Sequence, residues 1–186
     1  MRATALLKRT AAGIVMALAF TGAVAVSPSA AYASDDWTVR IAPKSQPGLF
    51  LDVSGASKDT LARVIQWPLT TGDNQIWTIR HISGTDYEFI NKHSGKCMET
   101  DNVAGHQLFQ APCDGNRWQL WSYDKAQDGS SGYLIWNTLT NLYVDVYGAS
   151  RTQGAAIDAW PFDGYDTTNY PFLQGPLNQE FLLLNA

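Results

Sequence analysis

Two segments of the chain repeat the same polar and aromatic residues at the same spacing. Leu51–Pro68 and Val144–Pro161 share eight identities in eighteen positions without a gap. In each segment an Asp and a Trp lie fifteen residues apart, and an Asn-Gln pair follows the closing Trp-Pro. Carboxylate and amide groups form hydrogen bonds, whereas an indole offers a flat apolar face. Such a set suits a ligand that carries hydroxyl groups around an apolar surface.

A weaker third copy lies between these two segments, in residues 97–121. Equivalent acids then fall at Asp52, Glu99 and Asp145, in steps of 47 and 46 residues. A near-constant period indicates one supersecondary unit that is used three times.

The elements that must position these residues are short strands. Twelve segments have an apolar alternation that ends at turn residues, which predicts strands, and no segment after residue 33 has a sustained helical period. They are Trp37–Ile41, Leu49–Val53, Arg63–Trp67, Gln75–Arg80, Tyr87–Asn91, Lys96–Glu99, Gln107–Gln110, Gln119–Tyr123, Tyr133–Asn137, Leu142–Val146, Ala156–Trp160 and Glu180–Leu184. Three sets of four strands predict one closed or capped all-β domain around a pseudo-threefold axis, with the last strand beside the first.

The first 33 residues have the features of a secretory signal peptide. Arg2, Lys8 and Arg9 precede a short apolar run, and Ala31-Tyr32-Ala33 has the form of a signal-peptidase site. The sequence therefore predicts a secreted, extracellular protein that begins near residue 34. The remaining 153 residues (186 minus 33) correspond to one ordinary domain.

The charge balance excludes some partners. Three bases and no acid lie in residues 1–33, which leaves 10 basic and 17 acidic residues, a net charge of −7. Nucleic acids and anionic membrane surfaces attract clustered bases, so neither is an expected partner. The two cysteines, Cys97 and Cys113, are expected to pair in an oxidising compartment. The three histidines are scattered, so we expect no metal site and no cofactor.

Three motifs spaced through the chain resemble those of the ricin-type β-trefoil lectins, which are also grouped as a carbohydrate-binding module family. The motifs are Gln75-Ile76-Trp77, Gln119-Leu120-Trp121 and Gln179-Glu180-Phe181, the last with Phe in place of Trp. The resemblance covers residues 34–186 and implies a β-trefoil of three four-stranded repeats, at about 34–84, 85–130 and 131–186. It also implies up to three sugar sites, one in each repeat, and a disulfide within a repeat, to which Cys97 and Cys113 correspond.

The resemblance further implies which residues bind sugar: an acid after the second strand, an aromatic on the third strand, and an Asn-Gln pair before the fourth. The first and third repeats contain this set, and the middle repeat departs from it because Ala111 replaces the aromatic. The expected carbohydrate-binding residues are Asp52, Trp67, Asn74 and Gln75 in the first repeat and Asp145, Trp160, Asn178 and Gln179 in the third.

Structural roles remain open for some of these residues. Trp77, Trp121 and Phe181 are expected in the shared core, because large aromatics on final strands fill it. Gln75 and Gln179 could contact ligand, or could bond the backbone of their own repeat.

The leading functional prediction is a secreted, monomeric, non-catalytic protein that binds glycans or polysaccharide, without membrane insertion. A glycosidase needs two carboxylates about 5–10 Å apart, and the repeated acids belong to separate repeats. The alternative is a protein-binding trefoil, such as a protease inhibitor, that uses exposed loops. One such loop is the aromatic insertion Phe162–Pro176, which could instead add Tyr165 or Tyr170 to the wall of the third site.

Overall fold

The computed structural model of the protein describes residues 36–164 and 176–186. The predicted signal peptide at 1–33 lies outside this range, as do Tyr165 and Tyr170 and most of the Phe162–Pro176 insertion. No helix among the described residues has the length and apolarity that a membrane span requires.

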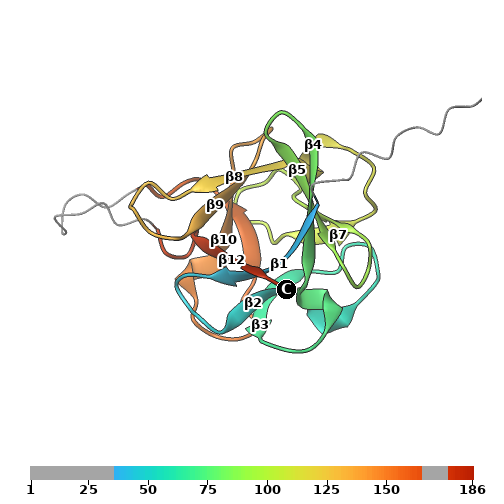
Figure 1. Cartoon of the computed structure of the whole chain (residues 1–186), viewed down its shortest axis with the longest axis horizontal. Coiled ribbons are helices and arrows are strands. Elements are labelled where there is room, and N and C mark those ends of the chain that lie inside the picture. Colours follow the sequence, from blue (N-terminus) through green and yellow to red (C-terminus); the bar gives the residue numbers. More distant parts are fainter. Residues whose placement is uncertain (1–35, 165–175) are drawn as a thin grey trace, which may run out of the picture. The chain divides into compact units, whose positions relative to one another are not determined.

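The described chain contains strands at the twelve predicted places, within a few residues (Figure 1). In chain order they are β1 (Trp37–Pro43), β2 (Leu49–Val53), β3 (Val64–Pro68), β4 (Trp77–Ser83), β5 (Asp86–Asn91), β6 (Cys97–Glu99), β7 (Phe109–Ala111), β8 (Trp121–Lys125), β9 (Tyr133–Asn137), β10 (Tyr143–Val146), β11 (Ile157–Trp160) and β12 (Phe181–Asn185).

The strand pairing has a threefold repeat. Among the described strands, the first and fourth of each set form a closed antiparallel ring in the order β1, β4, β5, β8, β9, β12 and back to β1. The second and third strands of each set form hairpins, β2–β3, β6–β7 and β10–β11. The last strand pairs with the first over five residue pairs, as the sequence predicted. Closure of the ring leaves none of its strands with an open edge.

The fourth strand of the first two sets begins later than predicted. Gln75 and Gln119, placed at strand starts by the sequence, are instead the last residues of short 3₁₀ turns, η2 (Asp73–Gln75) and η3 (Arg117–Gln119). Two further turns, η1 (Ser54–Ala56) and η4 (Tyr147–Ala149), follow the second strand of the first and third sets. Both contain a glycine in the left-handed region, which explains why Gly-Ala-Ser is repeated there.

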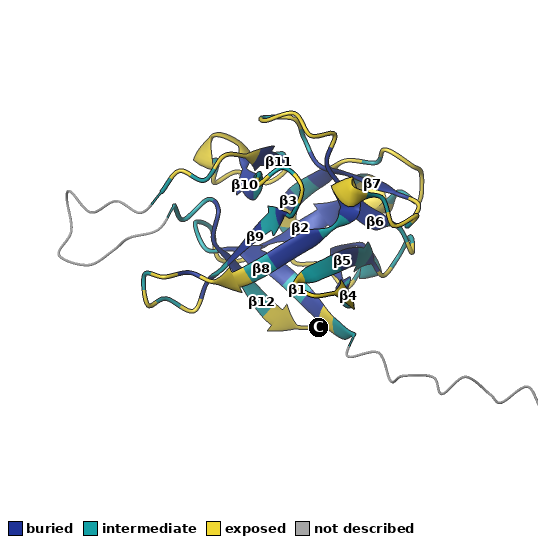
Figure 2. Ribbon diagram, turned by 90° about the horizontal axis from the view of Figure 1, so that it is seen from above, coloured by how far each residue is buried: buried dark blue, intermediate teal, exposed yellow. Residues whose placement is uncertain are grey.

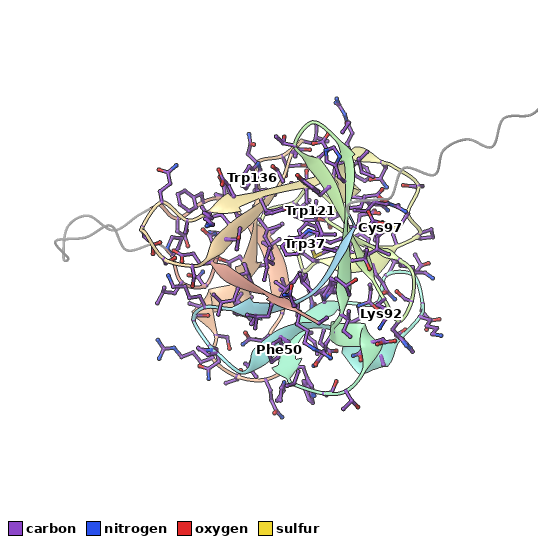
Figure 3. The ribbon with its side chains drawn as sticks, in the orientation of Figure 1. Trp37, Phe50, Lys92, Cys97, Trp121 and Trp136 are labelled. Carbon is purple, nitrogen blue, oxygen red and sulfur yellow. A yellow bond between two sulfur atoms is a disulfide. The ribbon has the colours of Figure 1, made fainter. Side chains whose placement is uncertain are left out.

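The core lies inside the ring and includes the three aromatic residues of the motifs. Trp77, Trp121 and Phe181 are fully buried, as predicted. Figure 2 shows the dark blue, buried segments of the strands in the interior of the ribbon. Trp121 is labelled in Figure 3, within the interior of the ribbon. Each indole also donates Nε1–H to a main-chain oxygen of the second strand of its repeat, Leu51 at 3.1 Å and Met98 at 3.0 Å. These bonds attach the hairpins to the ring.

The predicted disulfide is confirmed. Cys97 on β6 bonds to Cys113, just beyond β7, and their Cα atoms lie 5.1 Å apart. The bridge closes the hairpin of the middle repeat, which has the shortest second and third strands, of three residues each.

Removing this bridge should destabilise the fold. A cross-link that closes a loop of about 15 residues is worth about 3 kcal/mol in chain entropy, and its two sulfurs are separated by 16 positions. We expect the Cys97→Ala/Cys113→Ala variant to lose about 3 kcal/mol of unfolding free energy in urea denaturation. An unchanged denaturation midpoint would show that the hairpin holds its closed form without the bridge.

Candidate functional site

A cavity of about 400 Å³ opens over the hairpin of the first repeat. Three of the predicted binding residues, Asp52, Trp67 and Asn74, line it. The other lining residues are Ser54, Gly55, Ala56, Ile65 and Thr70. The structure therefore brings the acid, the indole and the amide of this repeat together, from β2, β3 and η2.

The polar groups of this cavity are oriented by each other. Asn74 Nδ2 donates to Asp52 Oδ2 at 2.8 Å and to the main-chain oxygen of Val53 at 3.3 Å. Burial raises the pKa of Asp52, and hydrogen bonds from Gln75 and Asn74 partly oppose this shift. Trp67, by contrast, is 37% exposed. The cavity thus presents a fixed carboxyl–amide pair beside an accessible indole face.

The third repeat has a matching cavity, also of about 400 Å³. Asp145, Trp160 and Asn178 line it, and Asn178 Nδ2 donates to Asp145 Oδ2 at 2.6 Å. The remaining lining residues are Tyr147, Gly148, Ala149, Asp158 and Asp163. The geometry of the first cavity is therefore repeated, with different residues on part of its wall.

Asp158 is a cavity residue that the sequence analysis missed. It lies directly opposite Asp145 in the β10–β11 register, where the first cavity has Ile65 opposite Asp52. Burial, and then the charge of Asp158 and a hydrogen bond with it, raise the pKa of Asp145 to about 8, and burial raises that of Asp158 to about 6. We interpret these shifts as one proton shared between the two buried carboxyl groups. In the sequence, the signal for Asp158 is a difference between the two repeated segments, Ile65 in the first and Asp158 in the other.

Gln75 and Gln179 do not line the cavities. Both are fully buried, and each side chain closes the turn that follows the third strand of its repeat, as does Gln119 in the middle repeat. The amide nitrogens donate to Pro68 (2.8 Å), Pro112 (2.8 Å) and Pro161 (2.9 Å), and the amide oxygens accept from the main-chain N–H of Thr70 (2.8 Å), Asp114 (3.2 Å) and Asp163 (3.0 Å). The structure thus shows the bonds to the backbone of their own repeat that the sequence left open for Gln75 and Gln179.

Comparison with known families agrees with this arrangement. Residues 31–104 and 73–160, together more than half of the chain, match the family of ricin-type beta-trefoil lectin domain-like proteins. The chain belongs to this family. No curated protein matches the chain.

Solved structures show the same β-trefoil fold. The designed threefold symmetric protein ThreeFoil is 24% identical, with a TM-score of 0.70, and the match covers 80% of this chain and 99% of that one. The ricin B-like lectin of Macrolepiota procera, solved in complex with lactose, is 19% identical, with a TM-score of 0.60 and coverage of 80% and 95%. An exo-β-1,3-galactanase from Clostridium thermocellum is 23% identical, with a TM-score of 0.67; the match covers 81% of this chain but only 30% of the enzyme.

In this trefoil, each cavity tryptophan lies against a glycine of another repeat. Trp67 lies beside Gly154 of the third repeat, and Trp160 beside Gly105 of the middle repeat. A Cβ atom on Gly154 would lie 3.6 Å from the Trp67 ring, and one on Gly105 would lie 2.9 Å from the Trp160 ring. The second distance is too short for any side chain, so the glycine leaves the space that the indole occupies.

In the middle repeat, the larger residue stands at the glycine position and the smaller residue at the tryptophan position. The main-chain bonds Gly154 N to Gln66 O, Gly105 N to Ala159 O and Leu61 N to Gln110 O are equivalent, at 2.7, 2.8 and 2.8 Å. Leu61 therefore takes the glycine position opposite Ala111, which takes the tryptophan position. Leu61 has a left-handed φ of 67°, which is costly for a leucine. In the middle repeat, a leucine thus stands at the glycine position and an alanine at the tryptophan position.

The acid of the middle repeat is also engaged. Glu99 Oε2 accepts from Gln119 Nε2 at 2.5 Å and from Asn116 Nδ2 at 3.3 Å. Trp118 stands at the position of Asn74, one residue before the glutamine. The middle repeat therefore lacks both the exposed indole and the acid–Asn-Gln set of the other two repeats, in line with the departure seen in the sequence.

One group of potential metal ligands occurs within the described residues. Glu88, Cys97 and Cys113 bring their ligand atoms within 4.8 Å of one another. Both sulfurs belong to the disulfide, so neither is available as a thiolate.

The contact between Gly105 and Trp160 can be tested directly. Gly105→Ala should displace the Trp160 ring, which an indole N–H resonance shift in ¹H–¹⁵N NMR would report. Gly115→Ala is the matched control, because Gly115 has a similar φ of 74° against 82°, but a Cβ there meets nothing within 4 Å. Both variants should lose about 1 kcal/mol of stability through the left-handed backbone, and only Gly105→Ala should shift Trp160. A Trp160 shift in the control alone would contradict the assignment.

The acid pair should also affect stability as pH changes. Both carboxyl groups have folded pKa values above the ordinary 3.8, so the folded protein binds more protons than the unfolded chain between about pH 4 and about pH 8. The contribution of the pair to unfolding free energy therefore falls as pH rises through this window. Asp158→Asn should reduce the fall measured by urea denaturation at several pH values, whereas Asp124→Asn, at an exposed site on β8, should not. An equal pH dependence in wild type and Asp158→Asn would refute the shared-proton interpretation.

Proposed function

We propose that the protein is a secreted, non-catalytic lectin that binds carbohydrate through the cavities of the first and third repeats. The observation that carries this proposal is the repeated combination of an exposed indole with an oriented carboxyl–amide pair, in two cavities of equal size. The signal-like features of residues 1–33 support secretion.

The geometry suits a pyranose ring. The apolar C–H face of the sugar would stack on Trp67 or Trp160, whose rings are partly exposed. The carboxylate of Asp52 would accept hydrogen bonds from two adjacent hydroxyl groups, with the strength that charge gives such bonds. Asp145, whose pKa of about 8 keeps it largely protonated at neutral pH, would donate to one hydroxyl group and accept from another. The Asn of each cavity already donates to the Asp, so its carbonyl oxygen remains to accept from a third hydroxyl.

Both cavities are open to solvent, so each contact replaces one with water, and single-site affinity should be weak. Two sites on one rigid body raise the affinity for a polymer, because the second binding event becomes intramolecular. Polysaccharides and multivalent glycans are therefore the proposed partners, and the protein would act as a monomer.

The acid pair of the third cavity does not favour a glycosidase. Asp145 and Asp158 lie side by side on paired strands, close enough to interact by a hydrogen bond. Glycosidases place their two carboxyl groups on opposite sides of the scissile bond, about 5–10 Å apart. We propose binding without hydrolysis, and release of reducing sugar from any bound polysaccharide would overturn this part of the proposal.

Substitution of the two cavity tryptophans tests the proposal, once a glycan array has supplied a ligand. Trp67→Ala and Trp160→Ala should each remove a stacking contact of about 1 kcal/mol beyond area, and each should eliminate one of two sites in calorimetry with a small sugar. Each single change should weaken binding to an insoluble polymer by a larger factor than binding to the small sugar, and the double change should abolish both.

Trp118→Ala is the matched control, because Trp118 is similarly exposed, at 44%, but lines neither cavity. It should leave stoichiometry and affinity unchanged. Full binding by the double variant, or glycan-independent inhibition of a protease panel by the wild type, would favour the protein-binding alternative.

A further inference from the structure

The two cavities share one construction but differ at three corresponding positions. Ile65 corresponds to Asp158, because each lies opposite the cavity acid in its hairpin. Thr70 corresponds to Asp163, because the main-chain N–H of each is held by the motif glutamine. Ser54 corresponds to Tyr147, the first residue of η1 and η4. The third cavity thus has two carboxyl groups in place of the isoleucine and threonine of the first, and an exposed phenol in place of its serine.

The difference gives the third cavity a strongly acidic lining. It has the carboxyl groups of Asp145, Asp158 and Asp163, whereas the first cavity has that of Asp52 alone. Among the described lining residues of the third cavity, no lysine or arginine balances this charge. Even when Asp145 and Asp158 hold one proton between them, this pair keeps one carboxylate, and the carboxyl group of Asp163 adds to it. The electrostatic field of the third cavity therefore favours a cation more than that of the first.

One atom in the third cavity has an unmet bonding requirement. Asp158 is only 2% exposed, and within the described residues its Oδ1 has no hydrogen-bond partner. A buried carboxyl oxygen without a partner costs free energy, which a donor on a ligand would offset. In the first cavity the same position is the apolar side chain of Ile65, which needs no donor.

From these contacts we propose that the third cavity selects a sugar that carries a protonated amine, such as a 2-amino-2-deoxyhexose unit, over the corresponding neutral sugar, with Asp158 as the residue that determines this specificity. The inference rests on the proposed function, because it assigns a substrate class to one of the two sugar cavities. An ammonium group has three donors and a positive charge, which can satisfy Asp158 Oδ1 and bridge it to Asp145. The ring that bears the amine would stack on Trp160, with Tyr147 as a second wall.

A bare divalent cation fits the cavity less well. Calcium takes six to eight oxygen ligands, and magnesium requires near-octahedral geometry. The described residues of the third cavity do not bring three ligand atoms of Asp, Glu, His or Cys side chains within 4.8 Å of one another. The exposed indole face of Trp160 would also have no role toward a metal ion. The cavity thus suits a ligand that combines a ring with a positive charge.

The test compares, within each of two hexoses, the amino sugar, the N-acetylated amino sugar and the parent sugar. Galactosamine, N-acetylgalactosamine and galactose form one set, and glucosamine, N-acetylglucosamine and glucose form the other. Binding to each cavity is followed separately by the indole resonances of Trp67 and Trp160 in ¹H–¹⁵N NMR titrations. For at least one hexose, the amino form should bind the third cavity roughly tenfold more tightly than its N-acetylated form, and the first cavity should show no such preference.

Reciprocal substitutions then exchange the two cavities. Asp158→Ile copies the first cavity and should remove the preference, and Asp158→Asn, which keeps the size of the side chain, should do the same if the isoleucine variant fails to fold. Ile65→Asp copies the third cavity and should create a preference for the amine in the first. Asp163→Asn measures how much the carboxyl group of Asp163 contributes to the preference for the amine.

The outcomes separate this inference from the proposed function. Sugar binding at both cavities without an amine preference, or a preference that persists in both Asp158 variants, would overturn the role of Asp158. A separate titration uses calcium chloride alone. Calcium binding at the third cavity that blocks sugar, without any amine preference, would also overturn the role of Asp158. Failure of every sugar to bind either cavity would refute the proposed function itself.

Discussion

The glutamine of each motif holds the turn on which the rest of the repeat depends. Its buried amide donates to the main chain just after the third strand and accepts from the main chain two residues further on. The turn so closed has the cavity tryptophan at one end and the cavity asparagine at the other, at Trp67 and Asn74 in the first repeat. Two buried hydrogen bonds between neutral groups thus fix the distance between the stacking surface of the tryptophan and the polar side chain of the asparagine.

The same construction explains how two cavities of one size can have different electrostatics. The frame consists of main-chain bonds, buried glutamines and the acid–asparagine pair. Ile65 and Asp158 take part in it through the main chain of their strands, and the side chain of Ile65 adds no hydrogen bond to it. A side chain on the cavity floor can therefore change from apolar to acidic while the frame stays in place. The cost appears as a raised pKa at Asp158, a still higher pKa at Asp145, and an Asp158 oxygen without a partner among the described residues.

Much of the fold could be predicted from the sequence, because alternation and turn residues define short strands and the 46- and 47-residue steps define the repeats. Gln75 was misplaced on a strand, since its side chain, and not its position in an apolar alternation, determines the local backbone. Asp158 was overlooked because a search for shared residues passes over the positions at which copies differ. The packing of Trp160 against Gly105 joins two repeats, so no pattern within a single repeat could show it.

Because each cavity tryptophan packs against a glycine of another repeat, the three repeats have different structural roles. Trp160 of the third repeat rests against Gly105 of the middle repeat, and Trp67 of the first rests against Gly154 of the third. The middle repeat has Ala111 at the tryptophan position. A residue larger than glycine at position 105 would nevertheless displace the Trp160 ring of the third repeat. The middle repeat therefore supports a cavity of the third repeat, although none of the residues that line that cavity belongs to it.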